Sequence, residues 1–299
     1  IVDDAALKEA LIRGQVGGAA LDVYGTEPLT GDHMWRGVPN VILTPHVGAS
    51  TAEAQRNVAV DACAVVRDAL VHGDLSRSLN VTMPAGDWAA LQPALSIARR
   101  CAAVARALLA DAGHRATTGI VLRYGADLES AAASLLNAAA LGALEGTADA
   151  GRLNIVSARS IAAGRGITLG SGGSALPHPR AIEIELAANG TRQRVAGVAP
   201  RDAAPRLTGV GEFRVDVVPR HTLLVLTNRD VPGVIGRVGT VLGTAGVNIA
   251  EYHQARLAVG GQALAVIATD GEVEASLREA LLAIPDVESA SLVRFADGL

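Results

Sequence analysis

The first part of the chain has apolar residues at helical spacing in two places. Residues 3–13 fit one helix, with Asp3 placed to cap its start and Gly14 placed where a helix commonly ends. The sequence STAE begins a second, longer helix, in which Ser50 and Glu53 have the spacing of a capping box. The pattern predicts both helices, and the first should pack on a sheet.

Two short apolar runs lie between these helices and have the pattern of buried parallel strands. Residues 16–23 are small and apolar, and NVILTPH spans residues 40–46. Asp22 lies near the end of the first run, and His46 ends the second. Because parallel strands finish at the same edge of a sheet, we expect Asp22 and His46 to lie on that edge.

The middle of the chain begins after SRSLNVTMPAG (76–86), where Pro84 and Gly86 indicate a linker. The glycine-rich segment GITLGSGGS (166–174) is expected to be a flexible loop, because it neither follows a clear strand nor opens a helix. Two helical runs and two strands are predicted here, at 92–111, 129–145, 182–187 and 194–199.

The last part of the chain predicts a βαββαβ order, which is the plan of a ferredoxin-like fold. A turn, RDVPG at 229–233, separates its first strand from its first helix. The predicted strands and helices, in chain order, are 223–228, 234–246, 247–256, 263–269, 272–283 and 289–295.

Composition argues against several kinds of function. A net charge of −4, a pI near 6.0 and the lack of any Lys/Arg run argue against nucleic acid as a partner. Cys63 and Cys101 have no second pair and no clustered histidine, so we expect buried free thiols and no metal site. The first residues lack a signal-peptide pattern and no run of about 18 apolar residues occurs, which predicts a cytoplasmic protein without a membrane span.

The segment DVYGTEP and the later LTPHVGAST bring together the groups that proton transfer needs. Histidine suits the transfer of a hydroxyl proton because its ordinary pKa lies near 6.5. A carboxylate bonded to the ring fixes its tautomer and favours the imidazolium, so Glu27 and His46 make a candidate acid/base pair. The alternatives are that His46 is a satisfied loop residue and Glu27 a solvated turn acid.

Three segments decide between these interpretations: IVDDAAL, GAALDVYGTEP and NVILTPHVGASTAEAQ. In order and spacing they resemble the last nucleotide-domain segments of the D-isomer-specific 2-hydroxyacid dehydrogenases. Within that family, the GASTAEAQ stretch and two further C-terminal parts are most similar to the long-form phosphoglycerate dehydrogenases. The resemblance covers nearly the whole chain and implies an NAD-dependent oxidation of 3-phosphoglycerate in serine biosynthesis.

The resemblance also assigns roles to individual residues. It implies that His46 is the catalytic acid/base and that Glu27 is its partner. It places Asp22 beside the nicotinamide carboxamide, although Asp22 can also be a strand-end cap. Gly48 and Ala49 correspond to the loop beside the ring of NAD.

An α/β chain of three parts follows from pattern and resemblance together. Residues 1–83 are predicted to end a Rossmann-type doubly wound NAD-binding and catalytic region, and residues 84–219 to form an α/β intervening domain of the kind associated with allosteric control. Residues 220–299 are predicted to form a ferredoxin-like ACT regulatory domain. In the middle part Arg152, Arg159 and Arg165 are either an anion patch or ordinary solvated charge.

The sequence departs from the family pattern in one important respect. A complete enzyme of this family needs a GxGxxG turn for the pyrophosphate and an arginine for the substrate carboxylate, and neither motif occurs among these 299 residues. We therefore expect this chain alone to be inactive. The alternative function is a non-catalytic, amino-acid-binding fragment that regulates or oligomerises.

The turn and helix of the ACT-like part have the groups that a free amino acid requires. Asp230 can accept from an ammonium, Asn248 can bond either end, and the amides after Pro232 can meet a carboxylate at the helix start. The resemblance implies L-serine as effector and a homo-oligomer that pairs ACT units. The alternative is a set of turn formers without a ligand. The expected effector positions are Asp230, Val231, Gly233, Val234, Asn248 and Ile249.

Overall fold

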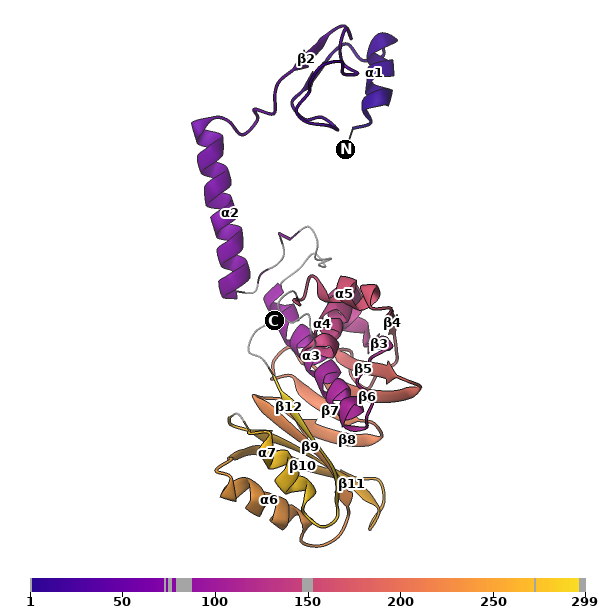
Figure 1. Cartoon of the computed structure of the whole chain (residues 1–299), viewed down its shortest axis with the longest axis vertical. Helices are drawn as coiled ribbons and strands as arrows, with labels where there is room; N and C mark the ends of the chain where they lie inside the picture. The colour runs from indigo at the N-terminus through magenta and orange to yellow at the C-terminus, as the bar shows by residue number, and fades with distance from the viewer. Residues whose placement is uncertain are drawn as a thin grey trace. The chain divides into compact units, whose positions relative to one another are not determined.

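The computed structural model describes residues 2–72, 74, 77–78, 88–146, 153–271 and 273–295. The chain divides into two compact units, Ile1–His72 and Gly73–Leu299 (Figure 1). The predicted domain boundary at 83/84 lies outside the described residues. The boundary at 219/220 stays a prediction, because the parts on either side of it belong to one compact unit.

The first unit contains, in chain order, a helix, two strands that pair in parallel and a second helix. The carboxylate of Asp3 accepts hydrogen bonds from two amides of the first turn, and Gly14 ends the helix with a φ of 71°. Both helices and both strands are confirmed, although the strands are shorter than predicted. They are α1 (Asp4–Ile12), β1 (Ala19–Leu21), β2 (Val41–Leu43) and α2 (Ala52–His72).

Helix α2 begins at a different cap from the one predicted. The Thr51 hydroxyl accepts from the amide of Ala54 at 3.1 Å, whereas the amide of Ser50 donates to Val47 in the preceding turn. The capping box of Ser50 and Glu53 is therefore wrong by one residue. None of the residues of α2 is buried, and its large apolar side chains Val58, Val60, Val66, Leu70 and Val71 are exposed.

The second unit contains a six-stranded sheet in the order β4-β3-β5-β6-β7-β8, with β4 parallel to β3 and the other pairs antiparallel. Both helical runs and both strands predicted here are confirmed. The strands are β3 (Gly119–Tyr124), β4 (Thr168–Gly173), β5 (Ala181–Ala188), β6 (Thr191–Val198), β7 (Arg206–Val210) and β8 (Phe213–Val217). The helices are α3 (Trp88–Asp111), η1 (Ala126–Ala131), α4 (Ala132–Leu144) and α5 (Ala158–Gly164).

The flexible loop predicted at 166–174 is wrong, because residues 168–173 form β4. This strand lies at the edge of the sheet and pairs in register with β3. Its small side chains hide the alternation by which a strand is recognised in a sequence. An edge position tolerates them, because an edge strand has one fewer neighbour to pack against.

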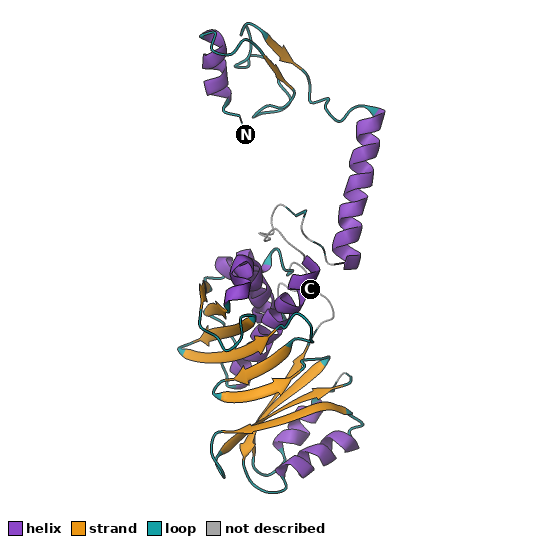
Figure 2. Ribbon diagram, turned by 180° about the vertical axis from the view of Figure 1, so that it is seen from behind, coloured by secondary structure: helices purple, strands orange, loops and turns teal. Residues whose placement is uncertain are grey.

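The last part of the chain forms the predicted βαββαβ fold, with its strands in the order β10-β11-β9-β12. Both faces of this sheet are covered. Helices α6 and α7 cover one face, and the six-stranded sheet lies against the other (Figure 2). Leu224 and Leu226 share a core with α6 and α7, whereas Leu223 and Val225 belong to the core shared with the six-stranded sheet. The elements are β9 (Thr222–Arg229), α6 (Val234–Thr244), β10 (Ile249–Arg256), β11 (Gln262–Thr269), α7 (Ser276–Leu282) and β12 (Val287–Arg294).

The two cysteines differ in exposure. Cys101 is buried on α3, and burial raises the pKa of its thiol, whereas Cys63 on α2 is exposed, so the prediction of two buried thiols holds for Cys101 alone. No helix in the described part of the chain is both long and apolar enough to span a lipid bilayer. Across the same residues, no cluster of three His, Cys, Asp or Glu side chains is arranged to hold a metal ion.

Helices α3 and α4 are in close contact at Gly142. A Cβ at this position would overlap the backbone carbonyl oxygen of Arg99. Backbone atoms yield less readily than a side chain, so the close contact of the two helices depends on this glycine. The neighbouring side chains Leu95, Ala98, Leu135 and Ala139 are fully buried.

We expect Gly142→Ala to destabilise the second unit by about 2 kcal/mol, because overpacking outweighs the gain in helix propensity. Urea unfolding of the full chain, followed by circular dichroism, measures this change. Gly164→Ala is the control, since a Cβ at Gly164 on α5 meets nothing within 4 Å. Equal midpoints for wild type and Gly142→Ala would contradict the close-contact interpretation.

Candidate active site and effector region

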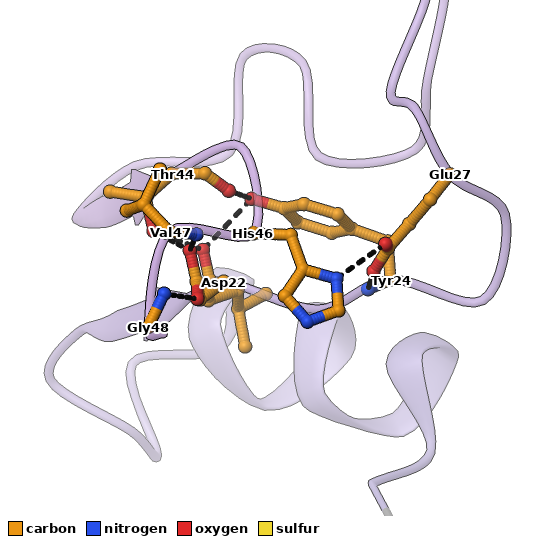
Figure 3. A network of polar contacts seen from close by, with 8 residues as sticks. Asp22, Tyr24, Glu27, Thr44, His46, Val47 and Gly48 are labelled. Atoms are coloured by element: carbon orange, nitrogen blue, oxygen red, sulfur yellow. Dashed lines mark hydrogen bonds and ion pairs between the residues drawn. The ribbon is translucent and has the colours of Figure 1, made fainter. Parts of the chain in front are cut away.

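The parallel pairing of β1 and β2 places the residues after each strand at one edge of the sheet. Asp22 follows β1, and its carboxylate accepts from the amides of Val47 and Gly48, both at 2.8 Å. These two amides directly follow His46. The structure therefore brings Asp22 and the His46 loop together, as the strand pattern predicts (Figure 3).

Asp22 holds the loop by three hydrogen bonds. The third comes from the Thr44 hydroxyl at 2.5 Å, and it is the main reason that the pKa of Asp22 lies below its usual value, followed by the Val47 amide. A Cβ at Gly48 would lie 3.1 Å from the Asp22 carboxylate, so a side chain there would crowd this contact. Asp22 is thus a structural anchor of the loop, and a role toward nicotinamide remains a prediction.

Tyr24 joins the ends of the two strands, and sequence reasoning did not assign it a role. Its hydroxyl lies 2.8 Å from the carbonyl oxygen of Leu21 and 2.7 Å from that of Thr44, so its proton is shared between the ends of β1 and β2. The amide of Tyr24 donates to Glu27 Oε1 at 2.8 Å. The signal was available, since Tyr24 stands inside the DVYGTEP segment.

His46 and Glu27 are in direct contact. Nδ1 of His46 lies 2.7 Å from Oε2 of Glu27, while Nε2 points away from Glu27 (Figure 3). His46 has a φ of 55°, in the left-handed region that few residues with side chains adopt. The three hydrogen bonds of Asp22 hold the surrounding loop in place. The two predicted side chains are therefore in contact through Nδ1, and their role in catalysis stays a prediction.

The charges of the pair stabilise each other. The hydrogen bond to Glu27 raises the pKa of His46 above its ordinary value, and the charge of Glu27 raises it further. The same hydrogen bond lowers the pKa of Glu27, with a second contribution from the Tyr24 amide. The ion pair is therefore present at pH values between the pKa of Glu27 and the pKa of His46. It is lost when Glu27 gains a proton at lower pH or when His46 loses one at higher pH.

A cavity of about 490 Å³ opens beside the pair. It is large enough for a small ligand and lies wholly within the first unit. His33 was missed by sequence reasoning, and its buried Nδ1 has no hydrogen-bond partner among the described residues. The lining residues are Tyr24, Glu27, Pro28, Leu29, His33, Leu43, Thr44, Pro45 and His46.

Ala49 follows this loop and is exposed. Its carbonyl oxygen accepts from the Gln55 side chain at 2.7 Å, which ties the loop to the first turn of α2. The predicted contact of Gly48 and Ala49 with a nicotinamide ring stays a prediction. In the middle part, Arg159 and Arg165 are exposed, and Arg152 lies outside the described residues.

In the ACT-like part, Asp230 makes contacts that the sequence did not suggest. Its carboxylate lies 3.0 Å from Arg256 Nη1 and accepts from the Gly260 amide at 3.2 Å. These contacts, with the Gly260 amide first, lower the pKa of Asp230. The amide of Asp230 donates to the carbonyl oxygen of Gly261, so Asp230 fixes the β10–β11 hairpin to the end of β9.

Asn248 lies at the opposite end of the same sheet. It precedes Ile249, which pairs with Thr269 and so lies at the start of β9, whereas Asp230 follows the end of β9. The 8 residues of β9 span about 23 Å at a rise of roughly 3.3 Å per residue. The Asn248 side chain donates to Asp270. One chain therefore does not bring the two predicted effector residues together.

The other predicted effector positions divide between backbone and core roles. Gly233 caps α6 with a φ of 90°, and no side chain caps the first turn. Val231 is partly exposed. Val234 is buried, so it can offer a ligand only backbone groups, whereas Ile249 is half-buried and packs against the same core.

Two family models match the chain. Residues 1–48 match the NAD-binding domain of the D-isomer specific 2-hydroxyacid dehydrogenases, and residues 221–286 match the ACT domain. The D-3-phosphoglycerate dehydrogenase of Synechocystis sp. is 34% identical over 98% of this chain and 53% of its own length. The chain is homologous to D-3-phosphoglycerate dehydrogenases.

Other relatives with the same name agree with this finding. The Bacillus subtilis protein is 30% identical over 98% of this chain and 55% of its own length. The Archaeoglobus fulgidus protein is 30% identical over 84% of this chain and 47% of its own length. The chain thus spans about half the length of the curated relatives that it matches. The match of residues 1–48 is to a domain that binds NAD in that family.

We expect Glu27→Gln to lower the pKa of His46, because the substitution removes the negative charge that favours the imidazolium. NMR titration of the histidine ring protons in the full chain measures this shift. Glu53→Gln, in the exposed first turn of α2, is the matched control and should leave the curve of His46 unchanged. An unchanged His46 curve in Glu27→Gln would show that the contact is absent in solution.

Proposed function

We propose that this chain provides the proton-transfer and regulatory parts of a cytoplasmic, NAD-dependent 3-phosphoglycerate dehydrogenase. The reaction is the oxidation of 3-phospho-D-glycerate to 3-phosphohydroxypyruvate in L-serine biosynthesis. The proposal rests chiefly on the 2.7 Å contact of His46 with Glu27 beside a cavity. It is supported by relatives that carry the name D-3-phosphoglycerate dehydrogenase and match 98% of the chain.

The proton path follows from the orientation of His46. In the oxidation, Nε2 of neutral His46 takes the proton of the substrate hydroxyl, and in the reverse direction the imidazolium returns it. The substrate carbon gives up a hydride, for which NAD is the acceptor when it is bound. Glu27 stabilises the imidazolium that forms and keeps the ring oriented through Nδ1.

The residues after β1 and β2 fit the nicotinamide end of such a cofactor. Gly48 has no side chain to obstruct a ring, and Asp22 fixes the backbone of this loop. The GxGxxG turn that seats a pyrophosphate does not occur in this sequence. We assign to this chain only the contacts of Asp22, Gly48 and Ala49 near the ring.

We propose further that the ACT part binds an amino-acid effector, with L-serine as the first candidate, between two copies of the chain. Among the described strands β10 pairs only with β11, so its other edge has no strand partner within this part of the chain. Antiparallel pairing of β10 with β10 of a second copy would bring Asn248 of the partner subunit toward Asp230. A twofold arrangement thus removes the separation found in one chain and accounts for a homo-oligomer.

A second candidate function is favoured by one observation, namely that the chain spans 53% and 55% of its first two relatives. Without a pyrophosphate-binding turn, these 299 residues alone would bind an amino acid and oligomerise without catalysis. Titration with NADH separates the two functions. Tight NADH binding by this chain alone would exclude the non-catalytic function.

In the natural full-length gene product, we expect His46→Gln to lower kcat about 10²- to 10⁴-fold, the usual contribution of a general acid/base. Glu27→Gln should cost less and should move the rising limb of the pH profile for oxidation to lower pH, because the pKa of His46 falls. NADH formation from 3-phospho-D-glycerate and NAD measures both effects. His72→Gln, at the exposed end of α2, is the control. Full activity in His46→Gln would overturn the proposed acid/base role.

Calorimetry with L-serine tests the effector site. We expect the wild-type chain to release or absorb heat on binding and Asp230→Ala to bind about ten-fold more weakly or not at all, because the acceptor for the ammonium is lost. Asp202→Ala, an exposed acid in the loop between β6 and β7, is the control. Equal heats from wild type and Asp230→Ala would remove the assignment of Asp230.

A further inference from the structure

The ion pair between Asp230 and Arg256 occupies the group that an effector ammonium would need. Nη1 of Arg256 lies 3.0 Å from Oδ2 of Asp230. The side chain of Arg256 is 57% exposed, whereas that of Asp230 is 18% exposed. A solute can therefore reach the guanidinium more readily than the carboxylate.

An α-amino acid carries the same two charges as this pair. Its ammonium and carboxylate are separated by one carbon, so it can place the ammonium on a carboxylate and the carboxylate on an adjacent guanidinium. An exposed ion pair contributes little to stability, so its exchange for two ligand contacts costs the fold little. Arginine also binds carboxylates well, because its planar guanidinium can donate two parallel hydrogen bonds.

The first turn of α6 adds to the attraction for a carboxylate. The N-cap residue of α6, Gly233, lies three positions after Asp230, and no side chain caps this helix. The amides at such a helix start favour a negative charge. Three groups thus lie at the same end of the sheet: the Asp230 carboxylate, which accepts hydrogen bonds, and the Arg256 guanidinium and the backbone amides of this turn, which donate them.

Arg229, which ends β9, and Arg237 of α6 also lie near this turn. Nη1 of Arg237 lies 3.0 Å from the position of a Cβ at Gly233. Its Nη2 faces Asp286 at 3.4 Å and the Pro285 carbonyl oxygen at 3.5 Å, on the side of β12. Arg256 instead ends the edge strand β10, along which a second copy would pair. Of these three arginines, Arg256 alone is on β10, at the end where Asn248 of the partner subunit would also arrive.

We infer that Arg256 binds the carboxylate of the effector. An α-amino acid then replaces the ion pair between Asp230 and Arg256 with two contacts of its own, from its ammonium to Asp230 and from Arg256 to its carboxylate. The inference rests on the proposed effector function of the ACT part. It defines the ligand class as zwitterionic α-amino acids, and it disfavours simple amines and hydroxy acids, which carry one charge each. It also gives Arg256 a role that its residue type and spacing in the sequence did not indicate.

Calorimetry of the full chain with L-serine, glycine and L-alanine, and with L-serinamide, tests the inference. L-Serinamide keeps the ammonium and replaces the carboxylate by a neutral amide. In wild type, we expect L-serinamide to bind about ten-fold or more weakly than L-serine. Arg256→Gln should weaken the binding of L-serine about ten-fold or more and change the affinity for L-serinamide by no more than about two-fold. The variant should therefore bind the two ligands with similar affinity. Arg256→Lys should recover part of the loss, since it restores the charge.

Two controls separate ligand binding from folding. Arg214→Gln removes an exposed arginine from β8 in the other sheet and should bind as wild type does. The melting temperature of Arg256→Gln should stay close to that of wild type, since an exposed pair is lost. A purely structural role, in which Arg256 only positions Asp230, would weaken L-serine and L-serinamide by the same factor.

The outcomes distinguish the inference from the function on which it rests. If none of the three amino acids binds wild type, the proposed effector function fails, and the inference fails with it. If L-serine binds wild type and Arg256→Gln equally, the effector function stands and the role of Arg256 is overturned. The same holds if the substitution weakens the binding of L-serine and of L-serinamide by the same factor.

Discussion

The hydrogen bonds that Asp22 accepts are the constraint on which the candidate active site depends. In the described residues of the first unit, only Leu11 and Trp35 are buried hydrophobic side chains. So small a core cannot fix a loop by packing alone. The three bonds to Asp22 and the bridging hydroxyl of Tyr24 do so instead, and they hold His46 in a left-handed conformation within reach of Glu27. Hydrogen bonds, more than apolar packing, therefore fix the geometry of this site. Substitutions in this polar network should change the position of His46 even where the substituted residue does not contact it.

The second unit is held together in the opposite way, by apolar packing across two sheets. Strand β9 contributes Leu223 and Val225 to one core and Leu224 and Leu226 to the other, so a single strand takes part in both layers. Glu251 on β10 adds a polar link, because its carboxylate accepts from the Val218 amide at 3.2 Å and from Arg206 at 2.9 Å. These contacts join the first residues of β10 to the region around β8 of the six-stranded sheet.

Sequence patterns predicted those parts of the structure in which local signals agree with tertiary packing. The βαββαβ order was predictable because strands with buried apolar runs alternate with helices at clear turns. β4 was not, because its residues 168–173 are small, and its strand conformation comes from pairing with β3. The adjacency of His46 and Glu27 followed from the motif, whereas the roles of Thr44 and Tyr24 depend on atoms that meet only after β1 and β2 pair. The same reason hid Arg256, which lies 26 positions from Asp230 and reaches it through the β10–β11 hairpin.

The separation of Asp230 and Asn248 constrains any account of regulation. β9 and β10 run parallel on either side of β11, so a residue after the end of β9 and one before the start of β10 must lie at opposite ends of the sheet. No rotamer change spans the roughly 23 Å length of an 8-residue strand. A ligand that contacts both residue types must therefore lie between two chains, with Asp230 from one and Asn248 from the other. Effector binding and association of the chains would then be one linked equilibrium, in which ligand favours assembly as strongly as assembly favours ligand.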